Sequence, residues 1–333
     1  MAMKRGRGAK GKEPGTGSQE PERGTRRAAK GNPGASGPSQ KGGSELETKL
    51  IHALVEVALA EDRAQDDITT NALIPADQPG RAQMLAKSPG VLAGLPLAEA
   101  AFDAVDSSLA WQAVKADGER VSPGDTVATV DGSLHSIIRA ERVALNFVAR
   151  LSGIATTAAA VVVLLEGTNC RLRDTRKTTP GLRALEKYAV RLGGGTNHRM
   201  DLGDGILIKD NHLAAVRARL PAASDYIAEA VRLARKSRPS VPIEIEVTTV
   251  DEARRALDAG ADELLLDNMS LDAMGEVVAL AAKRDRRPAL EASGGITVDS
   301  ARTVAETGVD YISMGAITQS APAVDLSLEM AVA

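Results

Sequence analysis

Residues 242–269, PIEIEVTTVDEARRALDAGADELLLDNM, contain two short apolar runs separated by a polar stretch whose apolar residues recur at helical spacing. The runs IEIEV and ELLLD have the length and composition of buried strands, and the stretch between them predicts a helix. A helix between two strands allows the strands to pair in parallel within one sheet. The segment therefore predicts a strand–helix–strand unit of an α/β fold.

The same alternation continues on both sides of this unit. Apolar runs predict strands at residues 170–175, 205–211, 242–249, 262–269, 288–295 and 309–316. Helical spacing predicts helices at residues 180–193, 224–237, 250–260, 270–284 and 298–308. Each strand ends in a polar side chain or a glycine turn, which is typical of the catalytic face of a barrel, whereas a doubly wound sheet concentrates its site at one switch point. Residues 142–319 are fewer than the about 250 of an eight-unit barrel, so we predict an incomplete barrel of six or seven strands.

Residues 44–141 show a different pattern. A helix capped by Ser44 is predicted first, followed by short strands that Gly, Pro and Asp-Gly turns interrupt. This mixture predicts an N-terminal α+β sandwich domain, and residues 320–333 are a candidate to pack back on it. From residue 139 to residue 167 the chain has a helical pattern, with a break expected at Ser152–Gly153.

Residues 1–43 hold ten Lys or Arg, three Glu and eleven Gly, with no large apolar residue beyond Met. Such a segment cannot bury enough apolar surface to fold, so we predict a disordered basic tail. A nucleic-acid tether is one interpretation of its charge. A solubilising or unselected extension is the interpretation that we favour.

The composition of the whole chain excludes several classes of protein. One Trp, three Tyr and two Phe are too few for the stacking platforms of single-stranded nucleic-acid binding, so nucleic acid is an unlikely partner. Cys170 stands alone, which excludes an intramolecular disulfide and a zinc cluster and fits a reducing, cytoplasmic location. The sequence has no run of eighteen apolar residues, so we expect no membrane span.

Glycine turns follow the last two predicted strands, in ASGGI and SMGAI. Backbone N–H groups in such turns can face an anion, and two neighbouring turns predict a phosphate cup. Packing is the other role that glycine could have there. The predicted cup comprises Ser293, Gly294, Gly295, Met314, Gly315 and Ala316.

Glu246 and Asp267 end two consecutive apolar strands. A carboxylate at the end of a buried strand is costly unless it is paired or binds a cation. Oxygen ligands near substrate phosphates indicate Mg²⁺ or ribose hydroxyls as their partners. A salt bridge to Lys209 or Arg176 is the alternative.

Cations gather at the same predicted strand ends. Arg176, Lys177, Arg199 and Lys209 should converge there and bind a ligand with several negative charges. Further along the segment, Arg183, Lys187 and Arg191 recur at helical spacing with Glu186, and we expect them to form a solvated helix face. The triple glycine 193–195 should bring His198 and Arg199 over the site, with His198 neutral because it adjoins an arginine.

Several long motifs in order resemble the quinolinate phosphoribosyltransferase family. They are DTRKTTPGLRALEKYAVRLGGGTNHRMDLGDGILIKDNH, DDITT, ERVALNFVARLSGIAT, IEIEVTT, LLLDNM, EASGGIT and GAITQSAPAVDLSLEM. The resemblance covers the chain from about residue 44 to its end and leaves out the basic tail. It implies Mg²⁺-dependent transfer of phosphoribose from phosphoribosyl pyrophosphate to quinolinate with decarboxylation, giving nicotinate mononucleotide, pyrophosphate and CO₂ in de novo NAD synthesis.

The resemblance also implies residue roles. Arg176, Arg199 and His198 would hold quinolinate beside Thr175, and Arg142 would reach it from a neighbouring subunit of a homodimer, with higher oligomers left open. Lys177 and Lys209 would face the pyrophosphate or the reacting carboxylate. Glu246 and Asp267 would hold ribose hydroxyls and Mg²⁺, directly or through water or substrate. The glycine turns would cradle the 5′-phosphate.

Two points remain open at this stage. Many bacterial members of the family have His where this chain has Gln319, although other members also carry Gln. Relatives associated with molybdenum transport share much of the fold and are the alternative to a quinolinate enzyme; the full set of Arg142, Arg176 and Arg199 favours quinolinate.

Overall fold

The computed structural model describes residues 46–222 and 224–332. The predicted basic tail, residues 1–43, lies outside the described residues, as does Ser44. Helix α1 (Thr48–Glu61) begins with Glu47 at its N-cap, so Ser44 is not the cap that we predicted.

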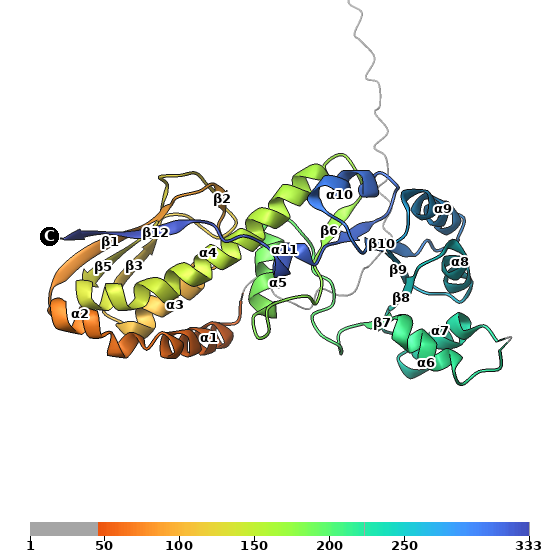
Figure 1. Cartoon of the computed structure of the whole chain (residues 1–333), viewed down its shortest axis with the longest axis horizontal. Helices are drawn as coiled ribbons and strands as arrows, with labels where there is room; N and C mark the ends of the chain where they lie inside the picture. Colours follow the sequence, from red (N-terminus) through yellow and green to blue (C-terminus); the bar gives the residue numbers. More distant parts are fainter. Residues whose placement is uncertain (1–45, 223, 333) are drawn as a thin grey trace, which may run out of the picture. The chain divides into compact units, whose positions relative to one another are not determined.

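The N-terminal part combines helices with a four-stranded antiparallel sheet of order β12-β1-β5-β3 and a separate β2-β4 pair (Figure 1). Its strands are β1 (Pro79–Ala86), β2 (Gly90–Val91), β3 (Ala110–Ala113), β4 (Arg120–Val121), β5 (Thr126–Ser133) and β12 (Leu326–Val332). Its helical segments after α1 are η1 (Ala64–Asp66), α2 (Ile68–Leu73) and α3 (Leu95–Val105). This arrangement confirms the predicted α+β part of the fold.

Strand β12 comes from the far end of the chain. It pairs with β1 in antiparallel register from Gly80↔Val332 to Ala86↔Leu326. Figure 1 shows the blue β12 beside the orange β1. The sheet is therefore built from both ends of the described chain.

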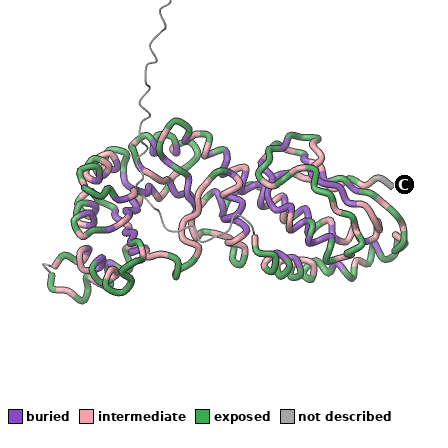
Figure 2. The backbone as a smooth tube through the Cα atoms, turned by 180° about the vertical axis from the view of Figure 1, so that it is seen from behind, coloured by how far each residue is buried: buried purple, intermediate pink, exposed green. Residues whose placement is uncertain are grey.

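Helix α4 (Leu134–Leu164) is continuous, so the predicted break at Ser152–Gly153 is wrong. Gly153 serves close packing instead: a Cβ there would lie 2.0 Å from the backbone oxygen of Pro322. By length and composition alone α4 could cross a membrane, a test that core helices also pass. Half of the most apolar stretch of α4 is buried (Figure 2). Ser152 Oγ on this helix also accepts a hydrogen bond from Ala93 N at 2.9 Å. Helix α4 is therefore a core helix of this fold.

The C-terminal part contains a six-stranded parallel sheet of order β6-β11-β10-β9-β8-β7. Its strands are β6 (Arg171–Arg173), β7 (Ile206–Ile208), β8 (Ile243–Val247), β9 (Glu263–Asp267), β10 (Ala289–Ser293) and β11 (Tyr311–Ser313). The edge strands β6 and β7 come first and second along the chain, and no ladder between them closes the sheet in the described residues. The prediction of an incomplete six- or seven-stranded barrel is thereby confirmed.

Helices alternate with these strands. They are α5 (Arg183–Leu192), α6 (Asp210–Arg217), α7 (Tyr226–Ser237), α8 (Val250–Asp258), α9 (Leu271–Ala281), α10 (Val298–Ala305) and α11 (Ala316–Gln319). From α7 to α10 each helix begins at a side chain that accepts hydrogen bonds from first-turn N–H groups, namely Asp225, Thr249, Ser270 and Thr297. Such caps satisfy backbone donors that a helix start leaves free, and they fix where each strand-to-helix loop ends.

Candidate active site

A pocket of about 520 Å³ lies at the carboxyl ends of the parallel strands. It gathers every residue predicted for the site except Arg142. Its lining includes Thr175, Arg176, Lys177, His198, Arg199, Lys209, Glu246, Asp267, Ser293, Gly294, Gly295, Met314, Gly315 and Ala316, together with Gln319. The parallel sheet explains this convergence, because all its strands deliver their last residues to one face.

Two arginines in the pocket have donors that no described residue satisfies. Nε of Arg176 and Nε of Arg199 are buried and have no hydrogen-bond partner among the described residues. Burial lowers the pKa of Arg199, and the neighbouring Arg176 lowers it further. Two neighbouring positive charges with unsatisfied donors indicate an anion-binding site.

Lys209 and Glu246 form an ion pair in which Nζ lies 2.6 Å from Oε2. The salt-bridge alternative therefore holds for Glu246 in this structure. The pair remains accessible to a ligand, because the Lys209 side chain is 44% exposed. Asp267 accepts a hydrogen bond from Asn268 Nδ2 at 2.9 Å through Oδ2. Glu246 and Asp267 lie on the adjacent strands β8 and β9, and carboxylate oxygens are the ligand type that a hard cation such as Mg²⁺ prefers.

The glycine turns bring backbone to the pocket wall. Gly294 has φ +89° and Gly295 has φ +61°, values that favour glycine. A Cβ on Gly294 would lie 2.4 Å from Asn268 Oδ1, and one on Gly315 would lie 2.7 Å from Cδ of Lys177. A side chain at either position would therefore collide with a residue that lines the pocket.

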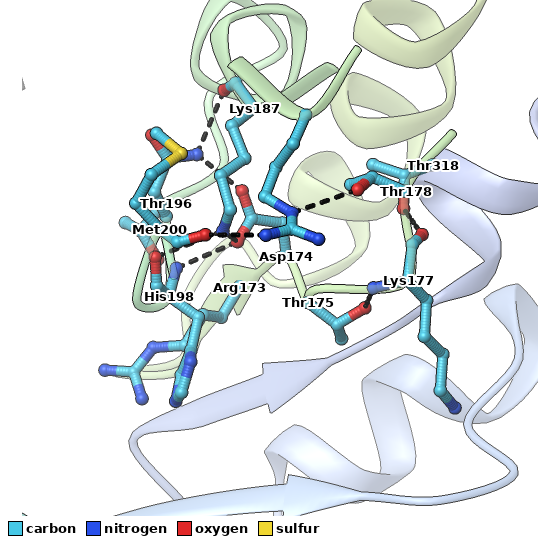
Figure 3. A network of polar contacts seen from close by, with 12 residues as sticks. Arg173, Asp174, Thr175, Lys177, Thr178, Lys187, Thr196, His198, Met200 and Thr318 are labelled. Carbon is cyan, nitrogen blue, oxygen red and sulfur yellow. Dashed lines mark hydrogen bonds and ion pairs between the residues drawn. The ribbon is translucent and has the colours of Figure 1, made fainter. Parts of the chain in front are cut away.

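The predicted solvated face of α5 is wrong. Lys187 and Glu186 are fully buried. Lys187 Nζ forms an ion pair with Asp174 Oδ1 and donates to the backbone oxygen of His198 at 3.1 Å. Asp174 also accepts from His198 N at 2.9 Å, so this pair fixes the backbone that carries His198 (Figure 3).

A second buried cluster lies beneath the pocket and was not predicted. The Arg173 guanidinium pairs with Glu263 and Glu291 and stacks 3.5 Å from the ring centroid of Tyr311. Burial raises the pKa of Glu263 to about 7 although Arg173 opposes this effect. The sequence signal was present: Glu244 and Glu291 interrupt the apolar strands β8 and β10, and Glu263 begins β9.

His198 joins this cluster through Glu244. Its Nε2 lies 2.7 Å from Glu244 Oε2. Burial lowers the pKa of His198, but the hydrogen bond to Glu244 and the charges of Glu244 and Glu291 outweigh it and raise the pKa above its ordinary value. This upward shift runs against the expectation that the adjoining arginine keeps His198 neutral. His198, Glu244 and Glu291 offer ligand atoms within 4.8 Å of one another, and Arg173 already pairs with Glu291.

Comparison with known proteins bears directly on this pocket. Residues 154–329 match the family described as quinolinate phosphoribosyl transferase, C-terminal domain, and residues 67–152 match the corresponding N-terminal domain. The chain belongs to the quinolinate phosphoribosyltransferase family.

Similarity to individual proteins of the quinolinate phosphoribosyltransferase family supports this assignment. Nicotinate-nucleotide pyrophosphorylase [carboxylating] of Mycobacterium leprae is 40% identical over 86% of this chain and 99% of its own length. The human protein of the same name is 39% identical over 84% of this chain and 91% of its own. The solved nicotinate-nucleotide pyrophosphorylase from Francisella tularensis has a TM-score of 0.79 and 37% identity over 86% of this chain and 98% of its own.

Arg142 is the predicted site residue that the structure places elsewhere. It is exposed on α4 and is missing from the described residues that line the pocket of its own chain. A role in a quinolinate phosphoribosyltransferase site would therefore require a second copy of the chain.

Proposed function

We propose that the protein is a nicotinate-nucleotide pyrophosphorylase of the carboxylating type, which transfers phosphoribose from phosphoribosyl pyrophosphate to quinolinate with loss of CO₂. The observation that carries the proposal is one pocket that combines four cations, the strand-end carboxylates of Glu246 and Asp267, and two glycine turns. Quinolinate brings two carboxylates, and the other substrate brings a phosphate and a pyrophosphate. The names of the relatives favour this activity over one of molybdenum-transport type.

In this proposal the residues divide the two substrates between them. Arg176 and Arg199 bind quinolinate carboxylates through their unsatisfied donors. Lys177 and Lys209 face the pyrophosphate or the reacting carboxylate, and the turns around Gly294 and Gly315 hold the 5′-phosphate. The product would be a pyridine nucleotide for de novo NAD synthesis in the cytoplasm.

The chemistry needs positioning and charge more than a strong base. Positive charge develops on the ribose as the bond from C1 to pyrophosphate breaks, and Glu246 and Asp267 stabilise it. The quinolinate nitrogen then forms the new bond to C1. The positive pyridinium nitrogen stabilises the carbanion that remains on the ring when the 2-carboxylate leaves as CO₂, and a proton from water then takes the place of the carboxylate. The same carboxylates would hold Mg²⁺, which would neutralise pyrophosphate charge. Holding both substrates in line supplies much of the rate.

Product analysis tests the proposal. Purified protein with quinolinate, phosphoribosyl pyrophosphate and Mg²⁺ should yield nicotinate mononucleotide, pyrophosphate and CO₂ in equal amounts. Nicotinate replaces quinolinate in the control, which should release no CO₂. Absence of the nucleotide product from quinolinate would reject the proposed function.

Arg176→Ala and Arg199→Ala should each weaken quinolinate binding by about 1–3 kcal/mol, because the carboxylate partner loses charge-assisted hydrogen bonds. Titration calorimetry measures the effect. The control is Arg232→Ala, which removes an equal charge from an exposed pair with Glu229 on α7 and should leave binding unchanged. Unaltered quinolinate affinity in both pocket variants would show that these arginines do not hold the substrate.

A further inference from the structure

Glu244 lies in the interior strand β8 and approaches the pocket only through His198. Its side chain is 7% exposed, and Oε2 lies 2.7 Å from His198 Nε2. His198 itself lines the pocket and is 12% exposed. The contact therefore links a buried carboxylate to a ring that a ligand can touch.

The backbone of His198 is held independently of its ring. Asp174 accepts a hydrogen bond from His198 N at 2.9 Å, and Lys187 Nζ donates to His198 O at 3.1 Å. The remaining variable of the ring is therefore the protonation of its two nitrogens. With Nε2 facing a carboxylate, Nε2 must carry a proton.

The protonation of Nδ1 decides what the ring offers to the pocket. In a neutral ring with Nε2–H, Nδ1 is an acceptor and repels a carboxylate oxygen. In the doubly protonated ring both nitrogens donate, and the ring carries a positive charge. An anionic ligand therefore needs the doubly protonated form.

The charges that face the ring favour this form. Glu244 on β8 lies nearest, and Glu291 Oε2 on β10 is 4.0 Å from Nε2. Arg173 on β6 opposes them, but it is paired with Glu263 and Glu291. Asp174 and Lys187 neutralise each other. Arg199, the next residue along the chain, adds positive charge that disfavours the doubly protonated ring. The carboxylates of Glu244 and Glu291 oppose this effect.

We propose that Glu244 is a positioning residue for the quinolinate site: it keeps His198 doubly protonated, with Nε2–H toward Glu244 and Nδ1–H available to a substrate carboxylate. The inference rests on the proposed function for the identity of the ligand. Glu244 is absent from the described residues that line the pocket, so it acts on a ligand through His198.

The first test needs no substrate. Histidine NMR of the full chain, with His198 assigned by its loss in His198→Asn, follows the ring through pH. We expect His198 to titrate above its ordinary pKa of 6.5 in the wild type and lower in Glu244→Gln, which keeps a hydrogen-bond acceptor but removes the charge. Glu186→Gln removes a buried carboxylate that pairs with Arg150 and not with His198, and should leave this titration in place. A wild-type titration below 6.5 would overturn the proposal even if Glu244→Gln fails to fold.

The second test uses turnover. Because a raised pKa keeps the charge present at low pH and loses it as pH rises, Glu244→Gln should resemble the wild type near pH 6. At pH 8 its KM for quinolinate should rise about tenfold, while kcat at saturation stays within about threefold. An equal rise of KM at both pH values would indicate a purely structural role and overturn the inference. If the protein does not convert quinolinate, the proposed function fails, and the substrate-free titration still decides the role of Glu244.

Discussion

Lys187→Met is expected to lower the free energy of unfolding by about 3–5 kcal/mol, because it leaves the Asp174 carboxylate buried without its cation. Both side chains are fully buried, and Asp174 also accepts hydrogen bonds from Asn197 Nδ2 and His198 N. Urea denaturation followed by circular dichroism measures the loss. Methionine preserves most of the packing volume, so the effect reports the charge.

A second variant separates charge from packing. Lys187→Met combined with Asp174→Asn removes both charges and should recover most of the lost stability, as replaced buried pairs often do. Arg232→Met, which breaks an exposed pair, should cost no more than about 1 kcal/mol. Equal losses in the single and double pocket variants would show that the ion pair is not what stabilises this region.

Arg142→Ala and Lys209→Ala are each expected to lose about a hundredfold or more of kcat/KM, yet their mixture should regain about a quarter of wild-type activity. Arg142 lies outside the pocket of its own chain, and Lys209 lines it. If sites are shared across a homodimer, half of randomly formed dimers are mixed, and each mixed dimer has one intact site of two. Steady-state assays of the co-expressed variants measure the recovery.

Sites that are not shared predict a different result for the co-expressed variants. If each site uses its own Arg142, no mixed dimer contains an intact site, and the mixture stays at the level of the single variants. Arg81→Ala in place of Arg142→Ala is the control, because Arg81 is an exposed cation of β1 and its loss should leave activity unchanged. Sedimentation of the wild type should then show a dimer or a larger even assembly.

The strand ends could be predicted from the sequence because they carry local signals. Glu246, Asp267 and the turn at Gly294 each follow an apolar run of strand length, and parallel pairing brings such ends together. The fold class followed from the same alternation. Each of these site residues could therefore be placed from the apolar run that precedes it in its own segment.

The buried charges could not be predicted in the same way. Lys187 has helical neighbours of like charge at positions 183 and 191, and its partner Asp174 lies in a different element. Likewise, Glu244 gives no sign that His198 is its partner until the sheet brings them together. Gly153 was misread as a helix break because its neighbour, Pro322, approaches from a segment distant in sequence.

The pairing of β1 with β12 has a consequence for synthesis on the ribosome. β1 emerges early, but its partner, which ends at Val332, emerges late. At roughly 5–20 residues per second the interval is on the order of ten seconds or more, during which one edge of β1 has no partner. An unpaired strand edge can pair with other chains, so nascent copies of this protein should depend on chaperones most strongly during this interval. Once β12 is released, it pairs with that edge of β1 and completes the four-stranded sheet.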